Sequence, residues 1–307
     1  MALPVKKMFL KLLLSCLIYA IPYKTIGQQV YTIDSAAKLP VEEFAKPKPF
    51  RFITNVPGDI SQIFQSPFQK KNLKWFLITA GATFAILPFD QRISDGIKHL
   101  SGQMHFHSET DYKVPIRFGK TKILRIPQNL NSAFYQLGEG GTSMIIAGGL
   151  FIYGKIGHDK KAIYTASDLT ETFITMGITT QLLKRISGRE SPFTATKPGG
   201  AWRPFPSFSE FQQNTSNYDA FPSGHLATMM ATVSTLRFNY PNKKWIGPVG
   251  YGLTTLTGLA MINTDVHWMS DYPLALALGY ISAKITYLKN HPKKPREPAS
   301  FNLASLQ

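Results

Sequence analysis

Six stretches rich in apolar residues, separated by polar turns, make up most of the chain from Trp75 onward. Their lengths and their alanine, leucine and methionine content favour helices over strands. Glycine and proline occupy the gaps between them. The predicted helices cover residues 75–89, 142–153, 166–183, 226–236, 246–262 and 272–283. This pattern predicts an all-α fold, a six-helix bundle with two long insertions at roughly 90–140 and 185–222.

Whether these helices cross a membrane is left open by the pattern. Most of the stretches are shorter than the about 20 apolar residues of a membrane span, mean hydropathy is only −0.08, and the third stretch carries Asp168 and Glu171. Three basic turns, at 155–161, 237–244 and 289–296, nevertheless share one end of an up-and-down bundle, as the positive-inside rule expects. Six full spans after a cleaved leader would put these turns outside, against that rule. We expect a periplasmic or membrane-surface bundle, with a spanning bundle as the alternative.

The N-terminus has the features of an export signal. Lys6 and Lys7 precede an apolar run over 8–21, and small or polar residues follow as far as Gly27. This order predicts a signal peptide over 1–27 and an exported protein, in the periplasm or the cell-envelope membrane. The residues before Cys16 loosely resemble a lipoprotein cleavage site, so lipidation at that cysteine is the alternative.

The rest of the chain divides by composition. Residues 28–70 are polar and rich in proline and lysine, which predicts a loosely ordered arm or a peripheral cover. Residues 71–290 hold the apolar stretches and form the predicted helical domain, and 291–307 form a basic, polar tail.

Charge limits the kind of partner. Lysine and arginine number 34 against 18 acidic residues, a formal net charge of +16. Such an excess favours phosphate esters, acidic lipid headgroups or nucleic acid. The basic residues are scattered and match no known nucleic-acid-binding motif, so we expect no nucleic acid partner. A single cysteine excludes an intramolecular disulfide.

The most informative short stretch is Pro-Ser-Gly-His at 222–225, just before the fourth apolar run. Ser223 is placed to cap the helix, whose first N–H groups form an anion site. Gly224 leaves room for an oxyanion to approach the backbone, and His225 projects from the first turn beside it. By itself the stretch also fits an ordinary capped helix with a surface histidine.

Two other stretches add a histidine–aspartate pair and positive charge. His267 and Asp271 are four residues apart, so on a helix they share one face, and the carboxylate can orient the ring. Lys184, Arg185 and Arg189 lie at a helix C-terminus, where they can neutralise phosphate oxygens. Taken singly, these stretches also fit a packed histidine and a solvated basic turn.

The order of these motifs resembles the type 2 phosphatidic acid phosphatase superfamily, which includes bacterial class A acid phosphatases and vanadium haloperoxidases. The resemblance implies a helical fold with long loops at the active-site end, and a reaction without metal or other cofactor. It implies that His267 is the nucleophile that forms a phosphohistidine, that Asp271 orients it, and that His225 protonates the leaving group. The residues that would hold the phosphoryl oxygens are Lys184, Ser223 and Gly224.

Two departures from the family pattern concern arginines. The family has arginine where this chain has Ser191, and another where it has Met261. Charge-assisted hydrogen bonds are worth about 1.5–3 kcal/mol each, so their loss weakens the transition state unless other cations replace them. Arg189 and Arg203 are the candidate replacements.

The resemblance leaves several functions to separate. The first is a metal-independent hydrolase of phosphomonoesters or lipid phosphates, acting on phosphatidate-like lipids, polyprenyl diphosphates, lipid A phosphates or small soluble esters at an extracytoplasmic site. The alternative is a catalytically weakened envelope protein of the same fold that binds phosphate or lipid. A haloperoxidase is disfavoured by the missing arginines, and a structural metal at His105 and His107 by the absence of a nearby turn signature. Aromatic residues in 193–222 suit either a lid over the site or loop anchors.

Overall fold

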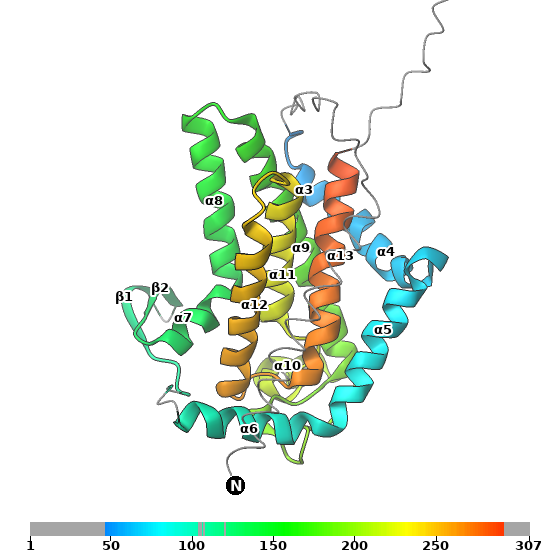
Figure 1. Cartoon of the computed structure of the whole chain (residues 1–307), viewed down its shortest axis with the longest axis vertical. Coiled ribbons are helices and arrows are strands. Elements are labelled where there is room, and N and C mark those ends of the chain that lie inside the picture. The colour runs from blue at the N-terminus through cyan, green and yellow to red at the C-terminus, as the bar shows by residue number, and fades with distance from the viewer. Residues whose placement is uncertain (1–46, 104–105, 107, 120, 292–307) are drawn as a thin grey trace, which may run out of the picture.

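The computed structural model describes residues 47–103, 106, 108–119 and 121–291 of the 307-residue chain. Antiparallel helices form an upright bundle (Figure 1). Each of the six predicted segments is helical, so the predicted helical bundle is confirmed. The helices of the bundle are α5 (Lys70–Ile86), α8 (Gly140–Ile156), α9 (Lys160–Ser187), α11 (Gly224–Asn239), α12 (Ile246–Asn263) and α13 (Tyr272–Asn290).

Helix α11 lies at the centre of the bundle. It contacts α8, α9, α12 and α13, and all of its residues from 226 to 235 are buried. A helix segment buried on every side shows no polar face, which is why residues 226–235 are all apolar or hydroxyl-bearing. Gly279 allows α13 to approach closely, because a Cβ there would lie 2.4 Å from the Ala227 carbonyl oxygen.

Local signals set the ends of the helices that carry the candidate site. Asp159 caps α9 by accepting a hydrogen bond from the Ala162 N–H at 3.0 Å. The same helix ends at Gly188, which is left-handed at φ 56°. Ser223 caps α11, as the sequence predicts.

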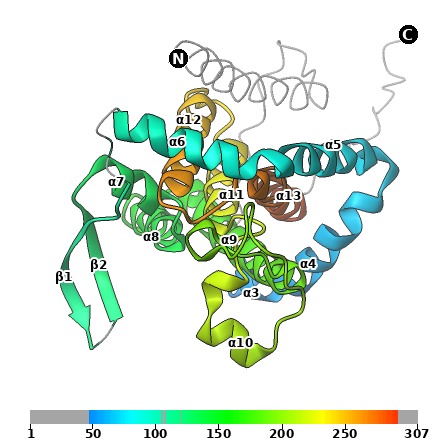
Figure 2. The same cartoon turned by 90° about the horizontal axis from the view of Figure 1, so that it is seen from below.

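The first insertion contains regular structure that the helix count missed. A 3₁₀ turn, η2 (Leu87–Phe89), joins α5 to α6 (Asp90–Gln103), which crosses the lower end of the bundle (Figures 1 and 2). Strands β1 (Tyr112–Phe118) and β2 (Thr121–Pro127) then form an antiparallel hairpin, followed by α7 (Leu130–Leu137). The hairpin is a small addition to the mostly helical fold, and short stretches of alternating polar and apolar residues on either side of Gly119 are its sequence signal.

Of the two alternatives for the N-terminal arm, the described part from Arg51 to Gln65 is helical and packs on α9 and α13, as a peripheral cover would. It forms α3 (Arg51–Thr54) and α4 (Val56–Gln65). Arg51 pairs with buried Asp168 of α9 at 2.6 Å, and buried Asp59 pairs with Lys289 of α13 at 2.8 Å. Ion pairs therefore hold this segment against the bundle. A polar sequence by itself does not show whether a segment is docked or disordered.

The second insertion carries short helical turns and exposed aromatic side chains at the lower end of the bundle. Its elements are η3 (Pro192–Thr194), α10 (Phe208–Gln213) and η4 (Thr215–Asn217). Phe193, Phe205 and Phe208 are exposed, whereas Phe211 is buried and stacks with Tyr218. Some aromatics therefore anchor the loop, and others face outward.

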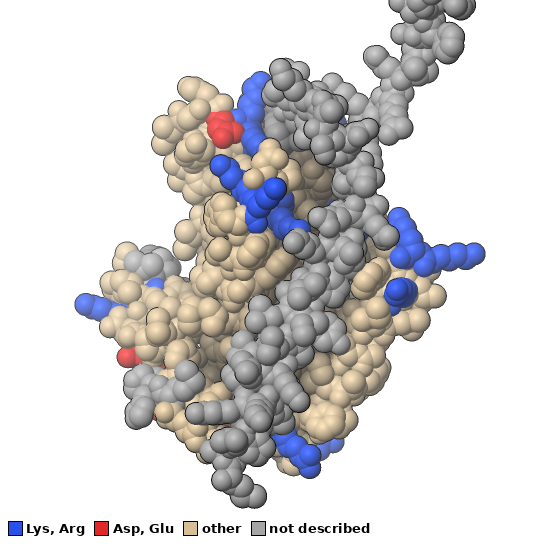
Figure 3. Space-filling view, viewed as in Figure 1, with Lys and Arg blue, Asp and Glu red and all other residues tan. Residues whose placement is uncertain are grey.

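The basic turns at 155–161 and 237–244, together with Lys289, lie at one end of the bundle, opposite α6 and α10. Lysine and arginine side chains gather near the upper end in Figure 3, where the α8–α9 and α11–α12 turns lie (Figure 1). Among the described residues, one continuous helical stretch, Lys70–Gln103, which comprises α5, η2 and α6, is long and apolar enough to cross a membrane, and only 6% of its apolar 18-residue window is buried. The predicted signal peptide, Cys16 and most of the C-terminal tail lie outside the described residues.

Candidate active site

The fold brings the three stretches together at the lower end of the bundle. Lys184 lies in the last turn of α9, His225 in the first turn of α11, and His267 just before α13. The rings of His225 and His267 lie 5.7 Å apart between centroids and meet edge to face. Two histidines that are 42 positions apart thus share one site.

The ring of His267 is buried and fixed by the backbone. Its Nδ1 lies 2.9 Å from the Ala220 carbonyl oxygen, so it donates there as an N–H and leaves the lone pair on Nε2. The nearest Asp271 oxygen is 3.7 Å from Nδ1, too far for a hydrogen bond. Burial, and then the charge of Lys184, lowers the pKa of His267 to about 3. The ring is therefore neutral at physiological pH.

Asp271 is held by groups other than the histidine. Its Oδ2 accepts from the Trp268 N–H at 2.8 Å, and its Oδ1 accepts from Arg189 at 2.5 Å. Burial raises the pKa of Asp271 to about 6, although Arg189 opposes the shift. The expectation that His267 and Asp271 share a helix face is wrong, because His267 precedes the 3₁₀ turn η5 (Met269–Asp271).

Arg189 is fully buried, and both of its Nη atoms donate to protein acceptors, whereas its buried Nε has no partner among the described residues. Its Nη1 donates to Asp271 and to the Ser270 hydroxyl, and its Nη2 donates to Asp90 at 2.6 Å. Asp90 opens α6 and also accepts from the Ser270 N–H. Arg189 thus links α6 to the segment that carries His267. No sequence signal marks Asp90, since it is a single acid at a helix start.

Arg203, the other candidate replacement, binds Glu190. Its Nη1 forms an ion pair with the Glu190 carboxylate, which also accepts from the N–H groups of Thr196 and Ala201. Burial alone would raise the pKa of Glu190, but these hydrogen bonds outweigh it and lower that pKa to about 2. Arg203 therefore stabilises the loop around Glu190 in this structure.

Lys184 stands beside the start of α11. Only 7% of its side chain is exposed, and its Nζ lies 3.4 Å from the Asp219 carboxylate. A Cβ on Gly224 would be 3.7 Å from that Nζ, so the ammonium is next to the helix N-terminus. Ser223 is buried, and its hydroxyl accepts from the Leu226 N–H at 3.4 Å. An anion between Lys184 and this terminus would meet a positive charge and backbone donors.

His225 contacts the first insertion as well as His267. Its ring lies 4.9 Å from that of Tyr135 on α7. Burial lowers the pKa of His225 well below its usual range, and the charges of His267, Lys184 and Arg125 add to this. Without substrate the ring is neutral.

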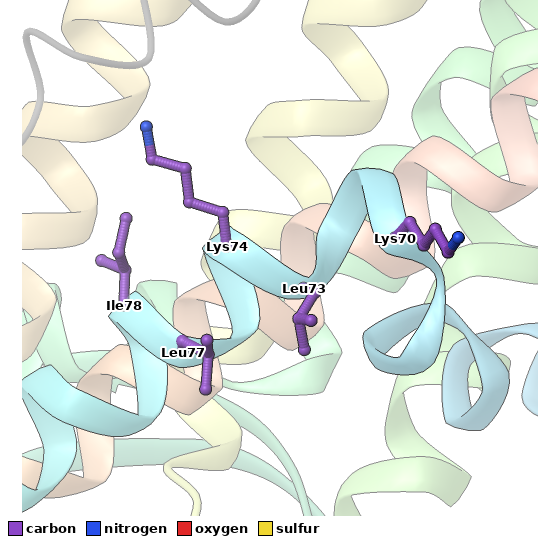
Figure 4. A pocket seen from close by; sticks show the side chains of 5 residues that line it. All are labelled: Lys70, Leu73, Lys74, Leu77 and Ile78. Atoms are coloured by element: carbon purple, nitrogen blue, oxygen red, sulfur yellow. The ribbon is translucent and has the colours of Figure 1, made fainter.

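The surface hollow beside α5 is separate from the histidine site, and the described residues form no metal cluster. Within the described part of the chain, no group of three or more metal-ligating side chains gathers, and His105 and His107 fall outside it. The hollow holds none of the histidine-site residues (Figure 4). Its lining residues all belong to α5 and are Lys70, Leu73, Lys74, Leu77 and Ile78.

Comparisons with known proteins agree with the motif order. Residues 165–294 match the family model of the PAP2 superfamily. Over 82 residues, 26% of this chain, the sequence is 28% identical to the lipid A 1-phosphatase of Porphyromonas gingivalis, of which the match spans only 18%. A crystal structure of the first transmembrane PAP2 type phosphatidylglycerolphosphate phosphatase from Bacillus subtilis is similar at a TM-score of 0.43 and 17% identity, covering 76% of this chain and 100% of that one. The family match contains all three stretches of the site.

Proposed function

Since residues 165–294 belong to the PAP2 superfamily, we propose that the chain hydrolyses phosphate esters of lipids with His267 as nucleophile and His225 as general acid. The observation that carries this proposal is the pairing of the two rings, 5.7 Å apart, beside Lys184 and the N-terminus of α11. A nucleophile, a proton donor and an anion site within one small volume are the parts that phosphoryl transfer needs.

The first half of the reaction follows from the tautomer of His267. Because Nδ1 donates to Ala220, Nε2 attacks phosphorus, and the bond from phosphorus to the leaving oxygen breaks. His225 gives its proton to that oxygen, and a phosphohistidine remains. In the second half, water gives a proton to His225 and attacks phosphorus, and the nitrogen–phosphorus bond breaks. Inorganic phosphate leaves, and both histidines return to their starting forms.

The substrate itself prepares His225 to act as an acid. Part of the lowering of its pKa comes from the positive charge of Lys184. A phosphate dianion bound at Lys184 offsets that charge, so binding favours the protonated ring. Protonation of the general acid is thereby tied to an occupied site. Lys184, Ser223 and Gly224 hold the transferred oxygens in this scheme.

A lipid substrate suits the surroundings of the site. Phe193, Phe205 and Phe208 are exposed on the loop at the same end, and α5 exposes a run of apolar side chains. The matched relative from Porphyromonas gingivalis is named for a lipid phosphate. We propose that α5 contacts the bilayer and that the exposed phenylalanines meet acyl chains, with the site on the extracytoplasmic side. The basic turns at the opposite end support this orientation.

A phosphate-binding relative without turnover is the second candidate. Met261 is fully buried in the core and Ser191 is 1% exposed, and neither side chain carries the positive charge of the arginine that the family has there. Arg189 and Arg203 are engaged by carboxylates. The lack of these two arginines and the pairing of Arg189 and Arg203 with carboxylates favour weaker binding of the transition state than in relatives that have both arginines.

Phosphate release by the purified full chain in detergent separates these candidates. Wild type, His267→Ala and the control His99→Ala, which alters an exposed histidine on α6, are assayed with chelator against a chromogenic monoester and a phosphorylated lipid. The proposal expects chelator-resistant activity in wild type and control, loss in His267→Ala, and preference for the lipid. Activity that survives in His267→Ala overturns the mechanism. Inactive wild type that still binds inorganic phosphate supports the second candidate.

A further inference from the structure

We infer that Arg125, on strand β2, is a substrate-binding residue that recognises negative charge on the leaving group, as in a diphosphate ester. The inference rests on the proposed function and adds a specificity determinant outside the matched family region, which begins at residue 165. It assigns the hairpin and α7 to substrate recognition, a role that none of the three sequence motifs indicates.

The hairpin contacts α7 and Glu139, which form one wall of the site next to His225. The Arg125 guanidinium forms an ion pair with Glu139, and the Arg125 carbonyl oxygen accepts from the Gln136 side chain at 3.0 Å. Glu139 directly follows Gly138, where a Cβ would lie only 2.8 Å from the Cβ of His225. The partner of Arg125 is therefore one residue away from direct contact with the proposed general acid.

Aromatic side chains hold the same wall in place. The ring of Tyr135 packs against His225 at 4.9 Å, and the Arg125 guanidinium lies 5.1 Å above the ring of Tyr112. Burial raises the pKa of Tyr135, the charges of Glu139 and Asp219 add to this, and the charge of Arg125 opposes it. Tyr135 thus lies within electrostatic reach both of the hairpin pair and of the acid beside Lys184.

The charge of Arg125 reaches His225, the proposed proton donor. Arg125 helps to lower the pKa of His225. The charges that shift the pKa of His267 are those of Lys184, Asp219 and Arg189. Arg125 therefore acts on the proton donor, which faces the leaving oxygen in the proposed mechanism.

The guanidinium can serve both Glu139 and a ligand. Its Nη2 faces Glu139, and 34% of the side chain is exposed. A planar fork with five N–H donors can keep one carboxylate and still bind a phosphate oxygen. When a terminal phosphate is cleaved from a prenyl diphosphate, the leaving group is a prenyl monophosphate, which brings its anionic charge to this wall. The prenol leaving group of a monophosphate brings none.

The test uses two substrates that share one lipid chain, farnesyl diphosphate and farnesyl monophosphate. Arg125→Ala is compared with Arg117→Ala, an exposed arginine on β1 of the same hairpin. We expect Arg125→Ala to lower kcat/KM for the diphosphate by about 10- to 100-fold, the loss of one charge-assisted hydrogen bond. The monophosphate should change less than about 3-fold, and Arg117→Ala should leave both substrates unchanged. Equal losses on both substrates, or no loss on either, overturn the inference.

A second variant separates substrate recognition from a purely structural ion pair. Glu139→Gln removes the carboxylate and leaves Arg125 in place. If Arg125 recognises the substrate, this variant should retain or raise diphosphate activity. If the Arg125–Glu139 ion pair only holds the structure together, this variant should lose as much diphosphate activity as Arg125→Ala does. Binding of methylenediphosphonate, measured by calorimetry, needs no turnover. If wild type hydrolyses neither substrate, the proposed function fails, and weaker methylenediphosphonate binding by Arg125→Ala alone still supports the inference.

Discussion

His267 directs its Nδ1 to the carbonyl oxygen of Ala220 at 2.9 Å, while the Asp271 carboxylate lies 3.7 Å from the same atom. A backbone oxygen cannot change its charge, so the tautomer of the proposed nucleophile is independent of the protonation of Asp271. The carboxylate instead binds Arg189 and the Trp268 N–H. Asp271 is therefore a positioning residue in this structure.

Asp271→Asn tests that division of roles. We expect kcat to fall by about 10- to 100-fold, the range seen when a partner that orients a reactive ligand is altered. His267→Ala should remove activity altogether. Steady-state kinetics on one lipid substrate measures both. A loss in Asp271→Asn as deep as in His267→Ala would show that the carboxylate contributes directly to the nucleophile.

We expect substitution of Arg189 to lower the stability of the fold, because this side chain pairs with two buried carboxylates. Replacing it with methionine leaves the buried carboxylates of Asp90 and Asp271 without their cation, which costs about 3–5 kcal/mol of unfolding free energy. Denaturant unfolding in detergent measures this cost. Arg185→Met, on the last turn of the same helix, is the control and should cost less than about 1 kcal/mol. An equal, small effect at both positions would mean that the pairs with Asp90 and Asp271 add little.

The bend after α9 requires glycine for two reasons. Gly188 has φ 56°, and a Cβ there would lie 1.7 Å from the Arg203 carbonyl oxygen. Gly188→Ala must therefore displace the 201–205 segment, and we expect more than about 2 kcal/mol of destabilisation together with lower activity. Gly199→Ala has a similar positive φ but open space, so about 1 kcal/mol is expected. Comparable melting temperatures for the two variants would contradict the clash.

Acid should destabilise the protein partly through His267. Its pKa is about 3 when folded against 6.5 normally, so between these pH values the unfolded chain binds a proton that the folded chain does not. Its stabilising effect is present above pH 6.5 and is lost as pH falls. Asp271, with its raised pKa, acts in the opposite sense between pH 3.8 and about 6.

His267→Phe isolates the contribution of the histidine, because Asp271 is present in both proteins. From pH 6.5 to 4.5 its unfolding free energy should fall less steeply than that of wild type, by up to about 1.4 kcal/mol per pH unit. Denaturant titrations at several pH values provide the slopes. Parallel slopes would mean that the folded protein protonates His267 as readily as the unfolded chain does.

Orientation can be tested with single cysteines. In a Cys16→Ser background, which has no other cysteine, Ser209→Cys places a thiol on exposed α10 at the site end, and Lys243→Cys places one in the exposed α11–α12 turn. A membrane-impermeant maleimide should label the first variant in intact cells and the second only after lysis. The reverse pattern would place the site on the cytoplasmic side.

The helical fold and the motifs were readable from the sequence because both depend on neighbours along the chain. Apolar runs of helical length, a serine before a helix and a Pro-Ser-Gly-His block are local patterns. The same reasoning missed the hairpin and the docking of Arg51 on Asp168, since polar segments become ordered only when a distant partner satisfies them.

The sequence by itself determined the family resemblance, the helices and the identities of His225, His267 and Lys184 as candidate site residues. Only the tertiary structure decided which groups touch them. The Ala220 carbonyl at His267, the Asp90 carboxylate at Arg189 and the Glu139–Arg125 pair near His225 join residues far apart in the chain. Carbonyls and single charged side chains have no sequence signature of partnership, because burial and distance in the folded chain determine how strongly they interact.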